Sequence, residues 1–171
     1  MKTTNNNLIF LVDDNELFLK SMESYVKQNF KGFAITTFTT GEECLKCLSQ
    51  NPGIILLDYM LNTKYPNAMN GIKVLEQIKK TNPEVAVIMF SAQDHIEVAV
   101  DTMKHGAFDY IIKNDRMFLR VQNAIKNVLH THSLKMDLQS YKRRMIGVGV
   151  VATLISGTII YMSIFCRNLL N

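Results

Sequence analysis

Five polar residues of this sequence share one kind of position: each follows a short apolar run, directly or after one further acidic residue. They are Asp13, Asp14, Asp58, Ser91 and Lys113. Each has an ordinary explanation when taken singly, since Asp14 could cap a helix, Ser91 could lie in a turn and Lys113 could be a solvated surface charge. Five such residues in the same kind of position are better explained by one site.

The residue types define the chemistry that such a site could perform. Three neighbouring carboxylates repel one another and need a cation, and hard oxygen ligands suit Mg²⁺, which also takes phosphate as a ligand. A carboxylate beside that ion can attack a phosphoryl group and form an aspartyl phosphate. A lysine ammonium and a serine hydroxyl can then hold the phosphoryl oxygens. The sequence has no Walker loop, no glycine-rich fingerprint and no Ser-His-Asp grouping, so nothing indicates that the chain itself binds a nucleotide.

A parallel sheet would bring these residues together. Four runs are apolar at successive positions, as in strands buried on both faces: 8–12, 54–57, 85–90 and 110–112. A fifth run at 33–38 is rich in Thr and aromatic residues and predicts an outer strand. Helical repeats separate the runs, and Thr40 followed by Glu43 predicts one helix start. The alternation predicts an α/β domain with helices on both faces and a ligand site at the carboxyl ends of the strands.

Several stretches of the sequence resemble the receiver domains of two-component response regulators. They are Val12-Asp13-Asp14-Asn15, Leu56-Leu57-Asp58, Ser91-Ala92 and Gly106-Ala107-Phe108-Asp109-Tyr110-Ile111-Ile112-Lys113. The resemblance covers about residues 7–130, and the motifs are highly specific as a set. It implies a doubly wound, flavodoxin-like fold with five parallel strands in the order 2-1-3-4-5. It also implies phosphotransfer from a histidine kinase or a histidine phosphotransfer protein.

The resemblance implies a role for each reactive side chain. Asp58 would be the phosphoacceptor, and Lys113 and Ser91 would complete the catalytic set. Ser91 and Tyr110 would form the switch that responds to phosphorylation. The chain would not be an enzyme beyond Mg²⁺-dependent self-phosphorylation from a phosphodonor and slow autodephosphorylation.

The resemblance also implies the metal ligands. Asp14, Asp58 and the backbone carbonyl of Met60 would bind Mg²⁺, with Asp13 acting through water. Met60 and Gln93 occupy positions that tune dephosphorylation in the family. Because an apolar Met60 side chain cannot position an attacking water, we expect a long-lived phosphoryl group.

Two features depart from the family pattern. The stretch from Asp58 to Gly71 is longer than usual and predicts an extended loop at 59–70, which either shapes partner choice or is a tolerated surface insertion. Asn114 stands where the family has proline, often after a cis bond. A cis bond before a non-proline residue costs about 2.5–4 kcal/mol, so the sequence leaves two alternatives open: a cis bond as in the family, or a trans bond with a re-aimed Lys113.

The C-terminal sequence predicts a membrane anchor. Residues 145–166 are 22 residues without any charge, Asn, Gln, His or Pro. Such a helix spans about 33 Å, enough for a bilayer core of roughly 30 Å, and a core helix is rarely apolar on every face for this length. Lys and Arg at 142–144 predict a single-pass protein with its receiver domain in the cytoplasm. The predicted organisation is a receiver domain at 1–130, a helical linker at 131–144, a transmembrane helix at 145–166 and a tail at 167–171.

The same region offers a candidate pairing surface. An apolar seam, Leu134, Leu138, Tyr141 and Met145, has spacing that fits either a short coiled coil or an amphipathic linker. Gly149, Thr153 and Gly157 repeat every four residues, a pattern that permits close helix pairing. The sequence therefore leaves a homodimer through the linker and the transmembrane helix as one candidate assembly.

Charge and cysteine content exclude several protein classes. The net charge of +4 comes from 19 Lys and Arg against 15 Asp and Glu, but residues 1–141 contain 15 of each. A folded part without excess positive charge argues against nucleic-acid binding. Cys44 and Cys47 have no second pair at zinc spacing and are interpreted as small apolar residues on a helix. The polar start 1–7 predicts no signal peptide.

The sequence therefore supports one leading function and two alternatives. The leading hypothesis is a membrane-anchored, single-domain response regulator that signals through protein contacts on the face carrying Tyr110 and the helix at 93–105. The first alternative is a phosphate sink or relay, which would use the same residues. The second is a scaffold, a receiver-like protein that never takes up phosphate, which the intact set of five residues disfavours.

Overall fold

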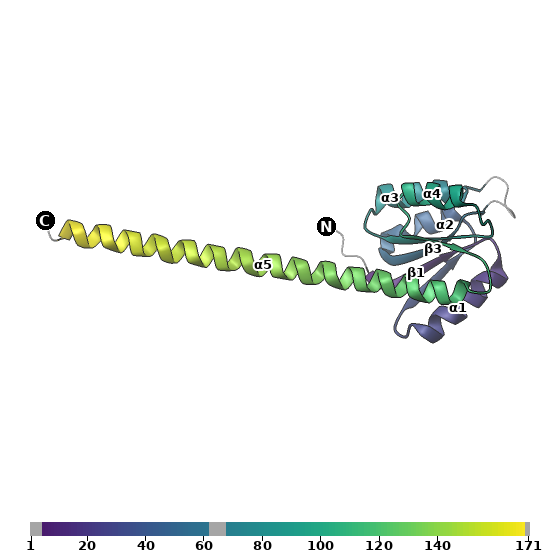
Figure 1. Cartoon of the computed structure of the whole chain (residues 1–171), viewed down its shortest axis with the longest axis horizontal. Coiled ribbons are helices and arrows are strands. Elements are labelled where there is room, and N and C mark those ends of the chain that lie inside the picture. The colour runs from purple at the N-terminus through teal and green to yellow at the C-terminus, as the bar shows by residue number, and fades with distance from the viewer. Residues whose placement is uncertain (1–4, 62–67, 170–171) are drawn as a thin grey trace. The chain divides into compact units, whose positions relative to one another are not determined.

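The computed structural model describes residues 5–61 and 68–169. The chain divides into two compact units, Met1–Leu129 and His130–Asn171. The strands of the first unit are β1 (Asn5–Val12), β2 (Ala34–Phe38), β3 (Pro52–Asp58), β4 (Ala86–Ser91) and β5 (Asp109–Ile112) (Figure 1). The helices are α1 (Glu16–Asn29), α2 (Gly41–Lys46), α3 (Gly71–Thr81), α4 (Ile96–Lys104) and α5 (Met117–Leu169), with a short 3-10 helix, η1 (Leu48–Gln50), after α2.

The five strands form one sheet in the order β2-β1-β3-β4-β5, and every neighbouring pair is parallel. This confirms the predicted α/β class, the doubly wound topology and the strand order. Parallel neighbours need crossover connections, and the helices between the strands supply them.

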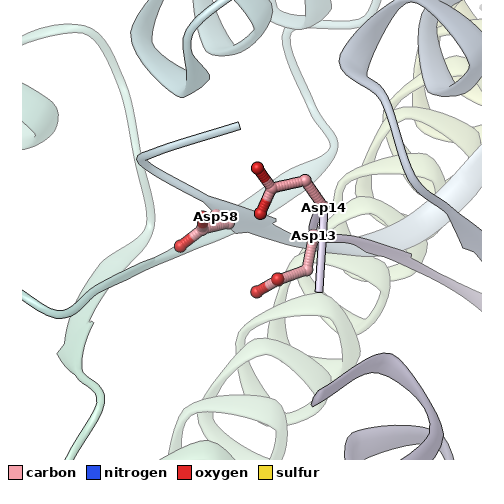
Figure 2. A group of neighbouring side chains, drawn as sticks. All are labelled: Asp13, Asp14 and Asp58. Atoms are coloured by element: carbon pink, nitrogen blue, oxygen red, sulfur yellow. The ribbon is translucent and has the colours of Figure 1, made fainter. Parts of the chain in front are cut away.

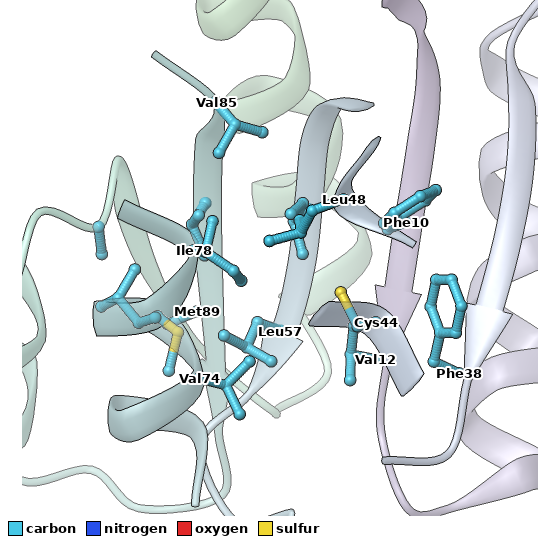
Figure 3. Close-up of a cluster of buried hydrophobic side chains, with 14 of the residues drawn as sticks. Phe10, Val12, Phe38, Cys44, Leu48, Leu57, Val74, Ile78, Val85 and Met89 are labelled. Atoms are coloured by element: carbon cyan, nitrogen blue, oxygen red, sulfur yellow. The ribbon is translucent and has the colours of Figure 1, made fainter. Parts of the chain in front are cut away.

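Two apolar layers cover the two faces of the sheet. Successive residues of a strand point to opposite faces, so Phe10 and Val12 of β1 pack under α2 and α3, whereas Ile9 and Leu11 pack under α1 and the start of α5. Figure 1 shows α2, α3 and α4 on one side of the sheet and α1 on the other. Figure 3 shows the cluster that includes Phe10, where side chains from the sheet, α2 and α3 meet. Burial on both faces explains why the central strands read as continuous apolar runs.

Local signals explain how the second crossover begins and ends. The Thr40 hydroxyl accepts a hydrogen bond from the Glu43 backbone N–H at 3.4 Å, which confirms the predicted cap of α2. Asn51 adopts a left-handed conformation with φ 53° after η1, and β3 begins at the next residue. Cys44 is buried in this segment. Burial is the main cause, and the nearby charge of Cys47 a second cause, that raises the pKa of the Cys44 thiol to about 12. An inert thiol agrees with the apolar interpretation of this pair.

The C-terminal helix corrects one prediction. The sequence predicts a helical linker at 131–144 that leads into a transmembrane helix at 145–166, and one helix, α5, runs through both segments for 53 residues. In the part of the chain that the structure describes, no helix combines the length and the apolar character needed to cross a membrane. The predicted transmembrane helix is therefore unsupported, and the predicted single-pass membrane location is wrong. The prediction rested on composition alone, the lack of charge over 145–166.

The apolar seam of the second unit lies on the surface of α5. Its four side chains are all more than half exposed in the single chain: Leu134, Leu138, Tyr141 and Met145. Their exposure is compatible with both interpretations of the seam, and the homodimer stays a prediction.

Candidate functional site

The register of the sheet brings the predicted site residues to one edge. The residue before Asp13 pairs with the residue before Asp58, so the two carboxylates come level at the ends of β1 and β3. Ser91 ends β4 and pairs with the last residue of β5, and Lys113 follows that residue directly. All four residues therefore lie at the carboxyl edge of the sheet, as the sequence predicts for the ligand site of an open parallel sheet.

Three carboxylates meet at this edge (Figure 2). One oxygen from each of Asp13, Asp14 and Asp58 lies within 4.8 Å of the others. The three residues are only 1%, 7% and 4% exposed, respectively. Like charges this close repel one another, and burial reduces the screening by water. A hard divalent cation with oxygen ligands would relieve the repulsion, so this donor set fits the predicted Mg²⁺.

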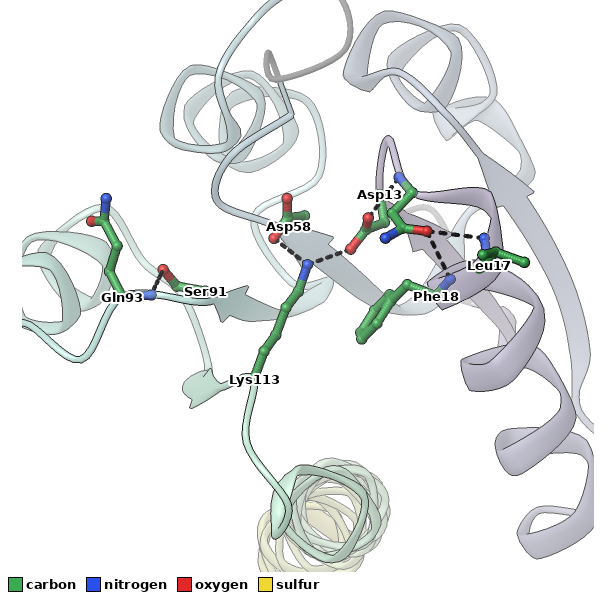
Figure 4. Close-up of polar contacts among 8 residues, drawn as sticks. Asp13, Leu17, Phe18, Asp58, Ser91, Gln93 and Lys113 are labelled. Carbon is green, nitrogen blue, oxygen red and sulfur yellow. Dashed lines mark hydrogen bonds and ion pairs between the residues drawn. The ribbon is translucent and has the colours of Figure 1, made fainter.

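Lys113 lies beside two of these carboxylates (Figure 4). Its ammonium nitrogen is 2.6 Å from Oδ2 of Asp13 and 2.8 Å from Oδ1 of Asp58. The structure contains no cis peptide bond among the residues that it describes, so the bond before Asn114 is trans. Of the two alternatives that the sequence left open, the bond is therefore trans, and Lys113 still reaches both carboxylates.

The electrostatics of the site follow from burial and these neighbours. Burial raises the pKa of Asp58 to about 6, the charge of Lys113 opposes this rise, and the charges of Asp13 and Asp14 add to it. Burial lowers the pKa of Lys113, but the charges of Asp58 and Asp13 outweigh burial, so the pKa is raised. Lys113 is therefore charged at neutral pH, whereas the ionised form of Asp58 is disfavoured in a site without a metal ion.

This shifted pKa predicts a pH dependence of stability in metal-free buffer. The pKa of Asp58 is about 6 in the folded chain against an ordinary value of 3.8. The folded chain binds the proton more tightly, so its stability should fall as the pH rises from about 4 to about 6 and then level off. The expected loss is at most about 3 kcal/mol.

Urea unfolding at a series of pH values would measure this loss. Asp58→Asn is the matched control, because it removes the titrating group and should flatten the slope between pH 4 and pH 6. An unchanged slope in that variant would assign the pH dependence to other groups.

Asn15 fixes the segment that carries the first two carboxylates. Its side-chain oxygen accepts hydrogen bonds from the backbone N–H groups of Leu17 at 3.0 Å and Phe18 at 3.2 Å, which caps α1. Its own N–H donates to Asp13 Oδ1 at 2.9 Å. The cap of α1 is therefore Asn15 and not Asp14, which the sequence also allowed.

Gly71 lets α3 begin against the end of β3. A Cβ atom at this position would lie 2.2 Å from the carbonyl oxygen of Asp58 and 2.7 Å from the Cα of Tyr59. The Gly71 N–H donates to the Tyr59 carbonyl at 2.9 Å. The backbone that presents Asp58 is thus packed directly on the first turn of α3.

Gly71→Ala should therefore destabilise the first unit by about 2–3 kcal/mol, because the atoms in the way belong to the backbone and cannot rotate aside. The free energy of unfolding in urea would measure the loss. Gly157→Ala is the matched control, since a Cβ there meets nothing within 4 Å. Equal stability of the Gly71→Ala variant and the wild-type chain would contradict the close approach.

Ser91 and Tyr110, the predicted switch pair, both contact Gln93. The Ser91 hydroxyl oxygen accepts from the Gln93 N–H at 3.0 Å, and the Tyr110 hydroxyl donates to the Gln93 carbonyl at 2.8 Å. Ser91 is fully buried, and Tyr110 is 7% exposed. The segment between β4 and α4 thus connects the two residues.

The long connection after β3 is tied to α2. Of the predicted loop at 59–70, residues 62–67 lie outside the described part of the chain. Met60 follows Asp58 by two positions and its side chain is 36% exposed, and its role as a carbonyl ligand stays a prediction. At the far end of the loop, the Met69 N–H donates to a carboxylate oxygen of Glu42 at 2.7 Å.

Sequence reasoning missed two contacts of the site. Phe18 places its ring against Lys113, a contact that is not among the sequence predictions. Glu42 holds the loop after β3 although the two are 27 residues apart in sequence. The aromatic residue four positions after Asp14 was the available signal for Phe18, whereas no local pattern connects Glu42 with that loop.

Comparison with known proteins agrees with this geometry. A model of the response regulator receiver domain matches residues 9–124. The luminescence regulatory protein LuxO of Vibrio campbellii is 37% identical over 99 residues, which are 56% of this chain and 21% of that protein. This chain thus spans about a fifth of the length of the LuxO proteins that it matches.

Solved structures share the fold. A response regulator receiver domain protein from Clostridium thermocellum has a TM-score of 0.64 and 25% identity, over 74% of this chain and 97% of that one. A chain of the CheX-CheY-BeF3-Mg²⁺ complex from Borrelia burgdorferi has a TM-score of 0.62 and 26% identity, over 71% and 88%. Given the match over most of the sheet and the acidic edge that it carries, the chain belongs to the response regulator receiver domain family.

Proposed function

We propose that Asp58 accepts a phosphoryl group from a phosphohistidine of a partner histidine kinase or histidine phosphotransfer protein. In this proposal Asp13, Asp14, Asp58 and the Met60 carbonyl hold Mg²⁺, with Asp13 acting through water. Lys113 and Ser91 hold the phosphoryl oxygens. The modified domain then signals through contacts with another protein.

One observation carries the proposal. Asp58 is a buried carboxylate whose neighbours are two further acidic residues and the ammonium group of Lys113. Burial in such a cluster is unfavourable for a carboxylate that has only a structural role. The cluster is explained if the Asp58 carboxylate acts as a phosphoacceptor, because it must then be poorly solvated and close to cations that also attract phosphate.

In the transfer step, the phosphoryl group moves from the donor histidine to Asp58. A bond forms between an Asp58 oxygen and phosphorus, while the bond from phosphorus to the histidine nitrogen of the donor breaks. The imidazole that leaves takes up a proton. Lys113 stabilises the negative charge on the transferring oxygens, and a bound Mg²⁺ would supply further positive charge there.

The proposed output surface lies on α4 and β5. Ile96 is 78% exposed, and Val100 and Met103 are each 47% exposed, so α4 presents an apolar stripe to solvent. Tyr110 on the neighbouring strand is bonded to the segment that leads into α4. A conformational change at Ser91 or Gln93 would therefore alter the position of this stripe. For this reason we propose the stripe as the contact surface.

The test is phosphorylation of the full chain by acetyl phosphate. With Mg²⁺ present, intact-mass spectrometry should detect one phosphoryl group per chain, and peptide mapping should place it on Asp58. Chelation of the metal should prevent the modification. A correctly folded chain that takes up no phosphoryl group would refute the proposal and favour the scaffold hypothesis.

A second comparison separates a regulator from a phosphate sink. Beryllofluoride with Mg²⁺ imitates the phosphorylated state without turnover. A regulator should bind a partner protein more tightly in that state than the Asp58→Asn variant does. A sink should have no partner that distinguishes the two, although it would be phosphorylated equally well.

A further inference from the structure

The ammonium group of Lys113 is held on three sides, and two of these are the carboxylates of Asp13 and Asp58. The ring face of Phe18 forms the third side, with the nitrogen 4.3 Å from the ring centroid. Figure 4 shows the ring beside the lysine. This distance lies within the range over which the negative face of an aromatic ring attracts a cation.

The Phe18 ring is itself fixed. Its backbone N–H donates to the capping side chain of Asn15 at 3.2 Å, in the first turn of α1. Its ring packs edge-on against Phe90, with centroids 5.7 Å apart and an interplanar angle of 74°. Phe90 in turn pairs with Asp58 in the sheet. The ring that contacts Lys113 therefore rests on the strand residue beside the proposed phosphoacceptor.

The Phe18 ring helps to fix the ammonium group of Lys113. Its flexible stem loses rotamer freedom when the ammonium group is fixed. Its side chain is 21% exposed, so water competes with the carboxylates for the ammonium group. An aromatic ring over that group blocks one approach of water and offers no oxygen or nitrogen that would compete with Asp13 and Asp58.

We propose that Phe18 is a positioning residue, which keeps the Lys113 ammonium group aimed at Asp58 while the phosphoryl group is bound. The contact between Phe18 and Lys113 is independent of the proposed function. Its effect on the bound phosphoryl group rests on that proposed function. Leu at position 18 would keep an apolar contact with Phe90 and lack the ring. Tyr would keep both, so Phe18→Leu and Phe18→Tyr form a matched pair.

The first test measures the contact in the full chain. In proton–carbon NMR spectra, the ring current of Phe18 should move the ε-methylene protons of Lys113 upfield from those of exposed lysines. Loss of the signal in Lys113→Met identifies it. Phe18→Leu should return it to the exposed-lysine position, and Phe18→Tyr should preserve the shift. A wild-type Lys113 signal that coincides with exposed lysines would overturn the inference.

The second test measures the consequence by fluorine NMR titration of the full chain with beryllofluoride and Mg²⁺. Phe18→Leu should weaken beryllofluoride binding about three- to tenfold, and Phe18→Tyr less than about twofold. In a Lys113→Met background, Phe18→Leu should cause no further weakening, since the cation that it positions is gone. An equal loss in both backgrounds would assign Phe18 to packing alone and refute the proposal.

The two tests keep this inference separate from the proposed function. A folded wild-type chain that binds no beryllofluoride would count against the phosphoacceptor role of Asp58. The Lys113 signal would then still support or overturn the contact with Phe18, because it requires neither Mg²⁺ nor a phosphoryl group.

Discussion

Asp58→Asn should abolish phosphorylation of the chain by acetyl phosphate and should also stabilise the metal-free protein. The amide has no negative oxygen to attack phosphorus, so the loss should be complete and not a change in rate. The stabilisation has a separate cause. Asp58 has a pKa of about 6 in the fold, so its anion is disfavoured there relative to the unfolded chain. Removal of that anion should stabilise the fold by about 1–3 kcal/mol at pH 8.

Intact-mass spectrometry and urea unfolding would measure the two effects on the same samples. Asp137→Asn is a suitable control, because it removes an exposed carboxylate from the second unit and should change neither quantity. Phosphorylation of Asp58→Asn to more than a trace would show that another residue is the acceptor. A fall in stability would show that the Asp58 anion is favourably bound by its neighbours.

Lys113→Met should destabilise the metal-free fold by about 3–5 kcal/mol at pH 8, because it leaves buried carboxylates without their ammonium partner. The loss should be smaller at pH 5. Without Lys113 the pKa of Asp58 rises further above its unfolded value, so the carboxyl group takes up a proton and its charge disappears. Mg²⁺ should restore part of the stability, since it binds the folded carboxylates and no longer competes with the lysine.

Urea unfolding at pH 5 and pH 8, with and without Mg²⁺, would test this prediction. Lys126→Met is the matched control, because it removes an exposed lysine of α5 and should cost little. If Lys113→Met lost the same stability at both pH values and did not respond to Mg²⁺, the stem of the lysine and not its charge would support the fold.

Much of the fold could be predicted from the sequence because one physical pattern recurs. Strands buried on both faces must be apolar at successive positions, so the runs at 54–57 and 85–90 identified β3 and β4. The polar residue after each run had to lie at the carboxyl edge, because parallel strands end on the same side. The sequence alone therefore predicts that Asp58 and Ser91 lie at one edge.

Side-chain contacts between distant residues could not be predicted in this way. Asp14 and Asn15 are both good capping residues, and the choice between them depends on where the first turn of α1 meets the end of β1. Phe18 fits the apolar stripe of α1, and its contact with Lys113 arises only when residues 95 positions apart meet. Periodicity reports which face a residue occupies and not which atom it touches.

The C-terminal part was predicted least well. A lack of charge over 145–166 is a property of composition, and it was interpreted as a membrane helix with a linker before it. One helix runs through the linker and this segment, and the part of the chain that the structure describes contains no candidate membrane span. Since Pro is absent from 117–169, the sequence offered no position at which a helix had to stop.

The ion pair between Asp13 and Lys113 joins residues 100 positions apart, and this separation has a consequence for the order of synthesis. A ribosome makes Asp13 and Asp14, which follow β1, and then Asp58 long before the lysine, which follows the edge strand β5. A nascent chain that has not yet reached that strand carries the acidic edge without its lysine, in its most self-repelling state. Lys113 is therefore translated after all three aspartates. The carboxyl edge of the sheet can adopt its final structure only once this lysine has been synthesised.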